Sequence, residues 1–124
     1  MSYIKYKKKN LFVENISVKR LISKYKSPFY LYSKANIVGN YEAFYSNFKK
    51  VDPLICFSVK ANSNVQILKI LKKMGSGADV VSGGELIKTL KSGIKPNKIV
   101  FSGVGKTEEE LRLAIRKNIL LINV

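Results

Sequence analysis

The sequence has no histidine, a single cysteine and no long apolar run. Its apolar runs reach about five or six residues, whereas a membrane-spanning helix needs about 20. The basic N-terminus is not followed by an apolar stretch that could serve as a signal peptide. The single Cys56 forms no internal disulfide, which fits a reducing compartment. These absences predict a cytoplasmic protein with no membrane partner.

Acidic residues are also scarce, with 8 Asp and Glu against 23 Lys and Arg, so the net charge is +15. Such a charge can indicate a nucleic-acid binder, because basic residues neutralise phosphates. However, 20 of the basic residues are lysines scattered along the chain and only three are arginines, the side chain that nucleic-acid recognition favours. We therefore expect adhesion to RNA at low salt but no specific nucleic-acid partner.

The first 35 residues read as a lead-in segment. The pattern predicts a short strand at 10–15 and a short amphipathic helix at 16–26, which Ser27-Pro28 ends. The aromatic content of 29–33 predicts another strand. A helix is expected over 36–49, because its apolar residues fall at helical spacing. These residues are Ile37, Tyr41, Phe44, Tyr45 and Phe48.

From residue 54 onward one unit repeats. Apolar runs begin near Leu54, Ala78, Lys98 and Ile119, and a turn and a helical pattern follow each of the first three. Nearly continuous apolar strands alternating with helices predict a parallel sheet covered by helices. Both a doubly wound sheet and a (β/α)8 barrel fit this pattern, and a barrel needs about 250 residues. Residues 36–124 supply three β/α units and a final strand, so we expect an incomplete domain.

The three helical patterns have clear apolar faces and ends. Gly93 is a good helix stop, and Thr107 with Glu110 forms a capping box. The predicted buried faces consist of Ile67, Leu68, Leu71 and Met74 in the first helix, Leu86, Ile87 and Leu90 in the second, and Leu111, Ala114 and Ile115 in the third.

Lys60 is the candidate reactive residue, because it directly follows the apolar run at 54–59. In both architectures functional groups gather at the carboxyl ends of the strands. If this lysine is half-buried among apolar residues, its pKa falls and its neutral amine can form a Schiff base. The alternative is a lysine whose amine simply reaches into solvent.

The stretch "FSVKANSN" at 57–64 resembles the pyridoxal-phosphate attachment site of the fold-type III amino-acid decarboxylases. Ile67, Leu68, Leu71 and Gly75 continue that family's spacing. Ser58 departs from the pattern, since alanine or proline is more usual, and Phe57 stands where tyrosine is common. The stretches "SPFYLYSKANI", "GADVVSGGEL" and "KIVFSGVGKTEEEL" are similar, in the same order, to the diaminopimelate decarboxylase branch of the family.

The resemblance implies the N-terminal part, about half, of a pyridoxal-phosphate-binding TIM-type (β/α)8 barrel. The implied cofactor is pyridoxal 5'-phosphate, and the implied activity is decarboxylation of meso-2,6-diaminoheptanedioate to L-lysine. The family's complete enzymes imply a small amino-acid substrate and a homodimer. Related ornithine, arginine or carboxynorspermidine decarboxylases, and a non-catalytic pyridoxal-phosphate carrier, remain alternatives.

The resemblance also assigns roles to individual residues. Lys60 would bind the cofactor covalently, and Asp79 would be the carboxylate that holds and tunes this amine, although a turn or capping residue is the alternative. Asn62 and Glu85 are weaker cofactor-site candidates, and ordinary helix capping explains Glu85 equally well. No metal site is expected. The family's ring-stacking histidine and glycine-rich phosphate cradle have no counterpart in this sequence, so we expect the 124 residues alone to be inactive.

Overall fold

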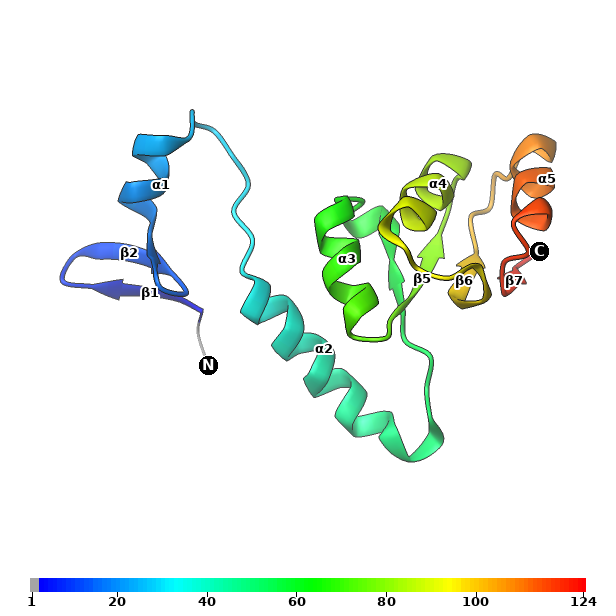
Figure 1. Cartoon of the computed structure of the whole chain (residues 1–124), viewed down its shortest axis with the longest axis horizontal. Coiled ribbons are helices and arrows are strands. Elements are labelled where there is room, and N and C mark those ends of the chain that lie inside the picture. Colours follow the sequence, from blue (N-terminus) through cyan, green and yellow to red (C-terminus); the bar gives the residue numbers. More distant parts are fainter. Residues whose placement is uncertain (1–2) are drawn as a thin grey trace. The chain divides into compact units, whose positions relative to one another are not determined.

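The computed structural model describes residues 3–124, which form two compact units with a boundary between Asn40 and Tyr41. Figure 1 shows the order of the elements along the chain. The two units are considered separately.

The first unit is a small antiparallel sheet followed by a short helix. Strand β1 (Ile4–Lys7) pairs with β2 (Asn10–Val13), which pairs with β3 (Ile16–Ser17), and α1 (Val18–Lys24) follows directly. The predicted strand at 10–15 and the helix within 16–26 are therefore confirmed in this shorter form.

One prediction for the first unit is wrong. Residues 29–33 form no strand, because they pair with no other strand in the part of the chain that the structure describes. Their aromatic side chains stay in solvent, and Tyr30 is 90% exposed. Aromatic residues favour strands because their side chains pack well on a paired sheet. Without a strand to pair with, aromatic composition alone does not produce a strand.

Helix α2 (Lys34–Phe48) confirms the helix predicted over 36–49, and it runs across the boundary between the units. Its apolar face is not buried: none of its residues is classed as buried, and Phe44 is 55% exposed. A short 3-10 turn, η1 (Lys49–Val51), follows it, and Asp52 then takes a left-handed conformation with φ of 47°.

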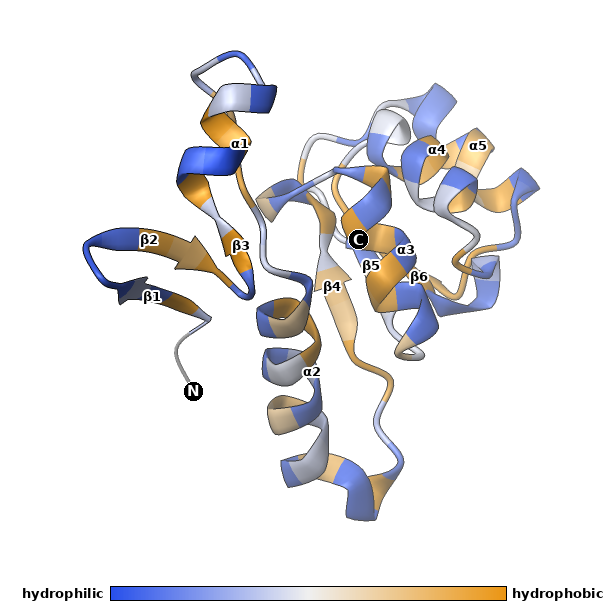
Figure 2. Cartoon of the chain, turned by 60° about the vertical axis from the view of Figure 1, so that its left-hand side comes forward, coloured by the Kyte–Doolittle hydropathy of each residue, from blue (hydrophilic) through white to orange (hydrophobic). Residues whose placement is uncertain are grey.

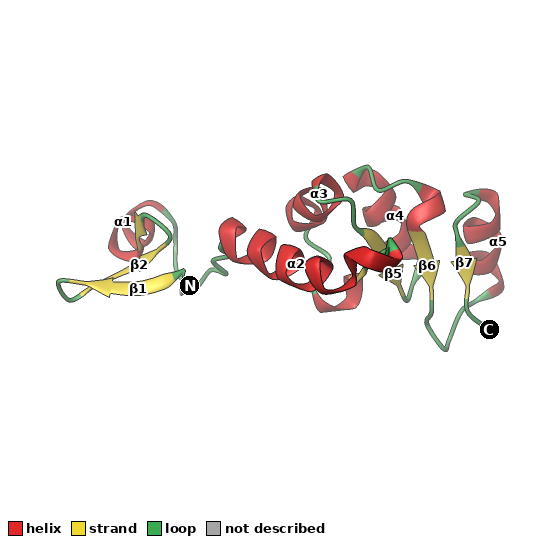
Figure 3. Ribbon diagram, turned by 90° about the horizontal axis from the view of Figure 1, so that it is seen from below, coloured by secondary structure: helices red, strands yellow, loops and turns green. Residues whose placement is uncertain are grey.

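The second unit confirms the predicted parallel α/β arrangement. Its sheet has the order β4-β5-β6-β7, with every pair parallel. Three helices alternate with the strands and cover one face of the sheet (Figures 1 and 3). The strands are β4 (Cys56–Ser58), β5 (Gly77–Val80), β6 (Ile99–Phe101) and β7 (Leu121–Ile122), and the helices are α3 (Val65–Lys73), α4 (Gly83–Ser92) and α5 (Glu108–Arg116).

The register of the strands sorts their side chains between two faces, because successive residues point to opposite sides. One row packs against the helices and forms the core together with Leu68, Leu86 and Ala114. The opposite row defines what we call the second face. The core row contains Phe57, Ala78, Val80, Ile99, Phe101 and Ile122, and the second face carries Ser58, Asp79, Val100 and Leu121.

The predicted ends of the helices are confirmed, and the predicted buried faces of the helices are partly wrong. Gly93 ends α4 in the left-handed conformation, and Thr107 and Glu110 form the capping box of α5. Each helix carries both hydrophilic and hydrophobic residues (Figure 2). Ile87 and Ile115, placed in the buried faces by their spacing, are 44% and 68% exposed. Helices α4 and α5 each bury only a narrow stripe against the sheet, centred on Leu86 and Ala114.

Gly77 at the start of β5 has no room for a side chain. A Cβ there would lie 2.4 Å from the backbone oxygen of Lys98 and 2.8 Å from the Cys56 Sγ. We expect Gly77→Ala to lower the free energy of unfolding by about 1–3 kcal/mol, as overpacking generally does. Urea denaturation followed by circular dichroism measures this loss. Gly84→Ala is the matched control, because only Ser82 Oγ, at 3.9 Å, would be near its Cβ, and an equal loss in both variants would contradict the packing argument.

Candidate active site

The four parallel strands end at the same edge of the sheet, which we call the carboxyl edge. Lys60 lies there, in the 3-10 turn η2 (Val59–Ala61) that follows β4. Val59 takes the buried position of this turn, and the Lys60 side chain is exposed. Of the two interpretations of Lys60, half-burial is wrong and an amine in solvent is confirmed, because the turn directs Val59 into the core and leaves the lysine outside. The amine is accessible to a ligand.

Asp79 lies within β5 on the second face, opposite Ser58 of β4. Its Oδ1 accepts a hydrogen bond from the Ser102 hydroxyl, which follows β6. The alternative interpretation of Asp79 as a turn or capping residue does not hold, since the residue is in a strand and caps no helix. Burial, and secondarily the charge of Asp79, raises the pKa of the Cys56 thiol on the same face.

Ser58 brings an unusual polar group to this region. Its Oγ is buried and has no hydrogen-bond partner among the described residues. The sequence identified Ser58 only as a departure from the family's pattern. The register shows that this hydroxyl lies on the strand next to Asp79 and two residues before Lys60, so the second face carries an unused hydrogen-bonding group close to the candidate amine.

Asn62 shapes the turn between η2 and α3. Its Oδ1 accepts a hydrogen bond of 3.0 Å from the backbone N–H of Asn64, and the Asn64 side chain in turn caps α3 through the N–H of Gln66. The structure thus gives Asn62 a local structural contact near Lys60.

Glu85 is engaged at the start of α4. Its Oε2 accepts a hydrogen bond of 2.9 Å from the backbone N–H of Val81, while its own N–H donates to the Ser82 hydroxyl. This is the capping arrangement that the sequence offered as the alternative to a cofactor contact.

Glu110 joins two loops of the carboxyl edge, a role that sequence reasoning missed. One carboxylate oxygen completes the capping box by accepting from the Thr107 N–H at 3.0 Å, and the other accepts from the Gly83 N–H at 2.7 Å. The capping-box pattern could reveal the first contact. The second joins residues 27 positions apart, so no local pattern could reveal it.

The loop at 102–107 is fixed by its backbone. A Cβ on Gly103 would lie 2.5 Å from the Val81 oxygen, whereas one on Gly105 would meet nothing within 4 Å. A close backbone approach therefore exists at Gly103 and not at Gly105. The Lys106 amine donates to the Gly103 carbonyl and, at 2.5 Å, to the Asn123 carbonyl. This lysine ties the loop to the end of β7.

The helix N-termini at this edge bind groups of their own chain. Side chains of Asn64, Ser82 and Thr107 cap α3, α4 and α5, and Glu110 takes the Gly83 N–H. Each of these termini thus has at least one N–H group occupied by a group of its own chain. The described part of the edge offers an amine, a carboxylate and two serine hydroxyls.

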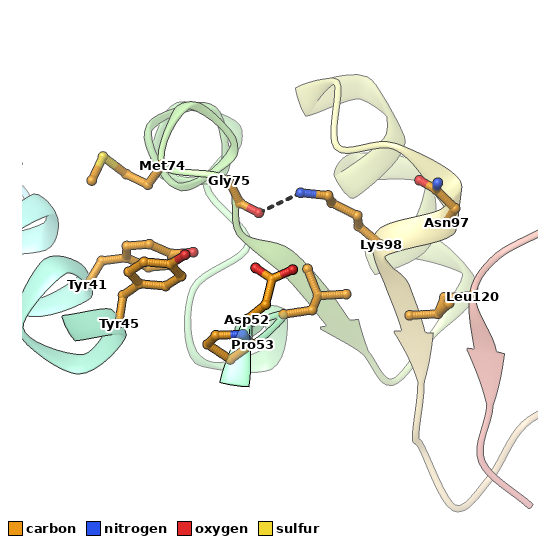
Figure 4. A pocket seen from close by; sticks show the side chains of 10 residues that line it. Tyr41, Tyr45, Asp52, Pro53, Met74, Gly75, Asn97, Lys98 and Leu120 are labelled. Atoms are coloured by element: carbon orange, nitrogen blue, oxygen red, sulfur yellow. Dashed lines mark hydrogen bonds between the residues drawn. The ribbon is translucent and has the colours of Figure 1, made fainter. Parts of the chain in front are cut away.

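A pocket of about 410 Å³ lies at the opposite edge, before the strands begin (Figure 4). Tyr41, Tyr45 and Asp52 line it together with Lys98, whose amine donates to the Gly75 carbonyl at 2.9 Å. Lys60 and Asp79 do not line this pocket, so it is separate from the candidate site.

Within residues 3–124 no three His, Cys, Asp or Glu side chains gather as metal ligands would. No helix in that range is long and apolar enough to cross a bilayer.

The sequence comparison identifies the family. Residues 34–124 match the pyridoxal binding domain of the pyridoxal-dependent decarboxylases, and the chain belongs to this family. The match includes the whole carboxyl edge described above.

Within this family, the chain is similar to diaminopimelate decarboxylases. The chain is 46% identical over 122 residues to diaminopimelate decarboxylase of Aquifex aeolicus, covering 98% of this chain and 29% of that protein. It is 51% identical over 104 residues to that of Helicobacter pylori J99, covering 84% of this chain and 26% of the relative. The chain therefore spans less than a third of these relatives' length.

A solved structure gives the same result for the fold. A crystal structure of diaminopimelate decarboxylase from M. jannaschii in complex with L-lysine matches with a TM-score of 0.93 at 35% identity, covering 98% of this chain and 29% of that one. The predicted fold class, part of a parallel α/β barrel that binds pyridoxal phosphate, is confirmed.

The two backbone hydrogen bonds that the Glu110 carboxylate accepts make the stability of the fold depend on pH. Hydrogen bonds, first from the Gly83 N–H and then from the Thr107 N–H, hold the pKa of this carboxyl below its usual value. A lowered folded-state pKa stabilises the fold above the unfolded value of about 4.3 and loses that effect as pH falls through the folded value. We expect Glu110→Gln to lower the midpoint of urea denaturation at pH 7, and the difference from the unmodified chain to shrink below about pH 5.

The neighbouring Glu109→Gln is the matched control. Glu109 lies in the same first turn of α5 and is exposed. A pH-independent difference for Glu110→Gln, or an equal one for Glu109→Gln, would contradict the assignment.

Proposed function

We propose that this chain supplies the cofactor-attachment part of an active site that decarboxylates meso-2,6-diaminoheptanedioate to L-lysine with pyridoxal 5'-phosphate. The observation that carries the proposal is the accessible Lys60 amine at the carboxyl edge, inside the region that matches the pyridoxal binding domain. The substrate follows from the diaminopimelate decarboxylases that the chain is most like among the relatives described, one of them solved with L-lysine.

The residues present fit the reactive end of this cofactor. An aldehyde requires an accessible amine, which Lys60 provides, and the positive charge that develops at its nitrogen requires an anion, which Asp79 provides from the same edge. Ser58 adds a buried hydroxyl without a partner on the same face. When bound, the cofactor ring supplies an electron sink for the electron pair that departing CO2 leaves behind.

Each residue then has a definite task. The Lys60 amine would hold the cofactor, and as a free amine it would hold a proton within reach of the substrate carbon. The Asp79 carboxylate orients that amine and stabilises its positive charge. Asn62 shapes the turn that carries Lys60, and Glu85 fixes the start of α4 below the edge.

The chain holds only part of the site. It spans about 30% of the length of its relatives, and its helix N-termini at the carboxyl edge are already capped. We infer that residues beyond this sequence supply further phosphate and substrate contacts. We assign 1–35 to a lead-in segment and 36–124 to the partial barrel, and we place the chain in a cytoplasmic homodimer when that barrel is complete. The 124 residues alone are inactive.

Reductive trapping tests the attachment residue. The chain is mixed with pyridoxal phosphate, reduced with borohydride, digested and mapped by mass spectrometry. We expect the label to concentrate at Lys60 and to disappear from that peptide in Lys60→Arg. Lys73→Arg, which removes another exposed lysine, should leave it unchanged. An even spread of label over the 20 lysines, or concentration at another one, would refute the assignment.

The substrate is tested in a polypeptide that carries this sequence at the full length of its relatives. We expect CO2 release from meso-2,6-diaminoheptanedioate to exceed release from L-ornithine or L-arginine by at least about a hundredfold, since a site built to bind the distal carboxylate of this substrate rejects substrates that lack that carboxylate. Preference for ornithine or arginine would assign the chain to a sister activity. Binding of the cofactor without any CO2 release would assign it to a carrier.

A further inference from the structure

Ser102 is placed to control the Asp79 carboxylate. Its backbone N–H continues the β5–β6 pairing by donating to the Val80 oxygen at 3.0 Å. Its hydroxyl therefore projects on the second face, the side that carries Asp79, and donates to Asp79 Oδ1. The contact joins the ends of two neighbouring strands at the carboxyl edge.

The position of Ser102 is fixed from both sides. Before it, Phe101 is fully buried in the core. After it, Gly103 packs so closely on Val81 that a Cβ would lie 2.5 Å from the Val81 oxygen, and the Gly103 carbonyl is held by Lys106. The serine hydroxyl consequently has a rigid base, which a residue needs if it is to orient another side chain.

The two oxygens of Asp79 are used differently. Among residues 3–124 the only hydrogen bond to this carboxylate comes from Ser102, and it goes to Oδ1. Ser58, on the strand at the other side of Asp79, makes no hydrogen bond through its buried Oγ. The carboxylate is thus anchored from β6 through one oxygen, which leaves Oδ2 for a donor on the β4 side, where Lys60 lies.

We propose that Ser102 is a positioning residue that holds the Asp79 carboxylate through Oδ1 so that Oδ2 serves the positive charge at the Lys60 nitrogen. This inference rests on the proposed function, because it assumes that Lys60 binds the cofactor. Ser102 touches neither the cofactor nor the substrate and acts only through Asp79.

The test compares side chains that differ in the hydroxyl. The readout is the pyridoxal phosphate concentration that half-saturates reductive labelling of Lys60. We expect Ser102→Ala and Ser102→Val to raise it about three- to tenfold, as loss of one hydrogen bond does. Ser102→Thr, which has nearly the shape of valine but keeps the hydroxyl, should restore it to within about twofold. Ser46→Ala, which removes an exposed serine of α2, should change nothing.

A double-mutant cycle separates positioning from a general structural role. We expect Asp79→Asn to weaken labelling at least as much as Ser102→Ala, and Ser102→Ala to have no further effect in the Asp79→Asn background, because coupled residues are not additive. Equal labelling by the Thr and Val variants, or additive effects in the double variant, overturns the inference while labelling of Lys60 persists. Absence of Lys60 labelling in the unmodified chain overturns the proposed function and this inference together.

Circular dichroism of each variant checks that it is folded. If Ser102→Ala is unfolded, the comparison of the Thr and Val variants decides, because both fill the same space. Stronger labelling of Ser102→Thr than of Ser102→Val at equal melting temperature supports the positioning role. Labelling that differs only as the melting temperatures of the variants differ contradicts it.

Discussion

The parallel register of β4, β5 and β6 is the constraint on which the rest of the second unit depends. It sends Phe57, Ala78 and Ile99 into the helix-covered core and their neighbours to the second face. Because all strands run in one direction, their ends bring Lys60, Asp79 and Ser102 to the same edge, although 42 positions separate the first from the last. A shift of one residue in any strand would exchange the faces and separate these side chains.

The same sheet is well covered on one side only. Helices α3, α4 and α5 bury the core row, whereas Leu121 on the second face is 53% exposed. The edge strands β4 and β7 each have one neighbour among the described residues. Parallel sheets are normally covered on both faces, and relatives about three times as long provide the chain for such a cover. Helices α3, α4 and α5 thus complete the core on one face of the sheet, and the second face is the one that such a cover would meet.

Features that depend on local patterns could be predicted from the sequence, whereas features that depend on non-local contacts could not. Apolar periodicity found all three β/α units, and spacing found the capping box of Thr107 and Glu110, because each signal lies within a few residues. The strand expected at 29–33 and the burial of Ile87 depended on partners elsewhere in the chain, and both predictions were wrong. The prediction that Lys60 binds the cofactor came from its family pattern and stays a prediction. The contacts from Ser102 to Asp79 and from Glu110 to Gly83 required the register, which no local pattern contains.

Because Lys60 is exposed, burial cannot be the reason why a cofactor would bind this lysine rather than another. Most of the 20 lysines are exposed, so burial does not distinguish this one. What distinguishes it is its position at the end of the strand next to Asp79, with the hydroxyls of Ser58 and Ser102 on the same face as that carboxylate. In a chain of net charge +15, attraction of an anionic cofactor is general and cannot choose a lysine. If Lys60 binds the cofactor as proposed, its selection depends on short-range contacts at the carboxyl edge, and an oriented Asp79 then matters more for Lys60 than the charge of the whole molecule.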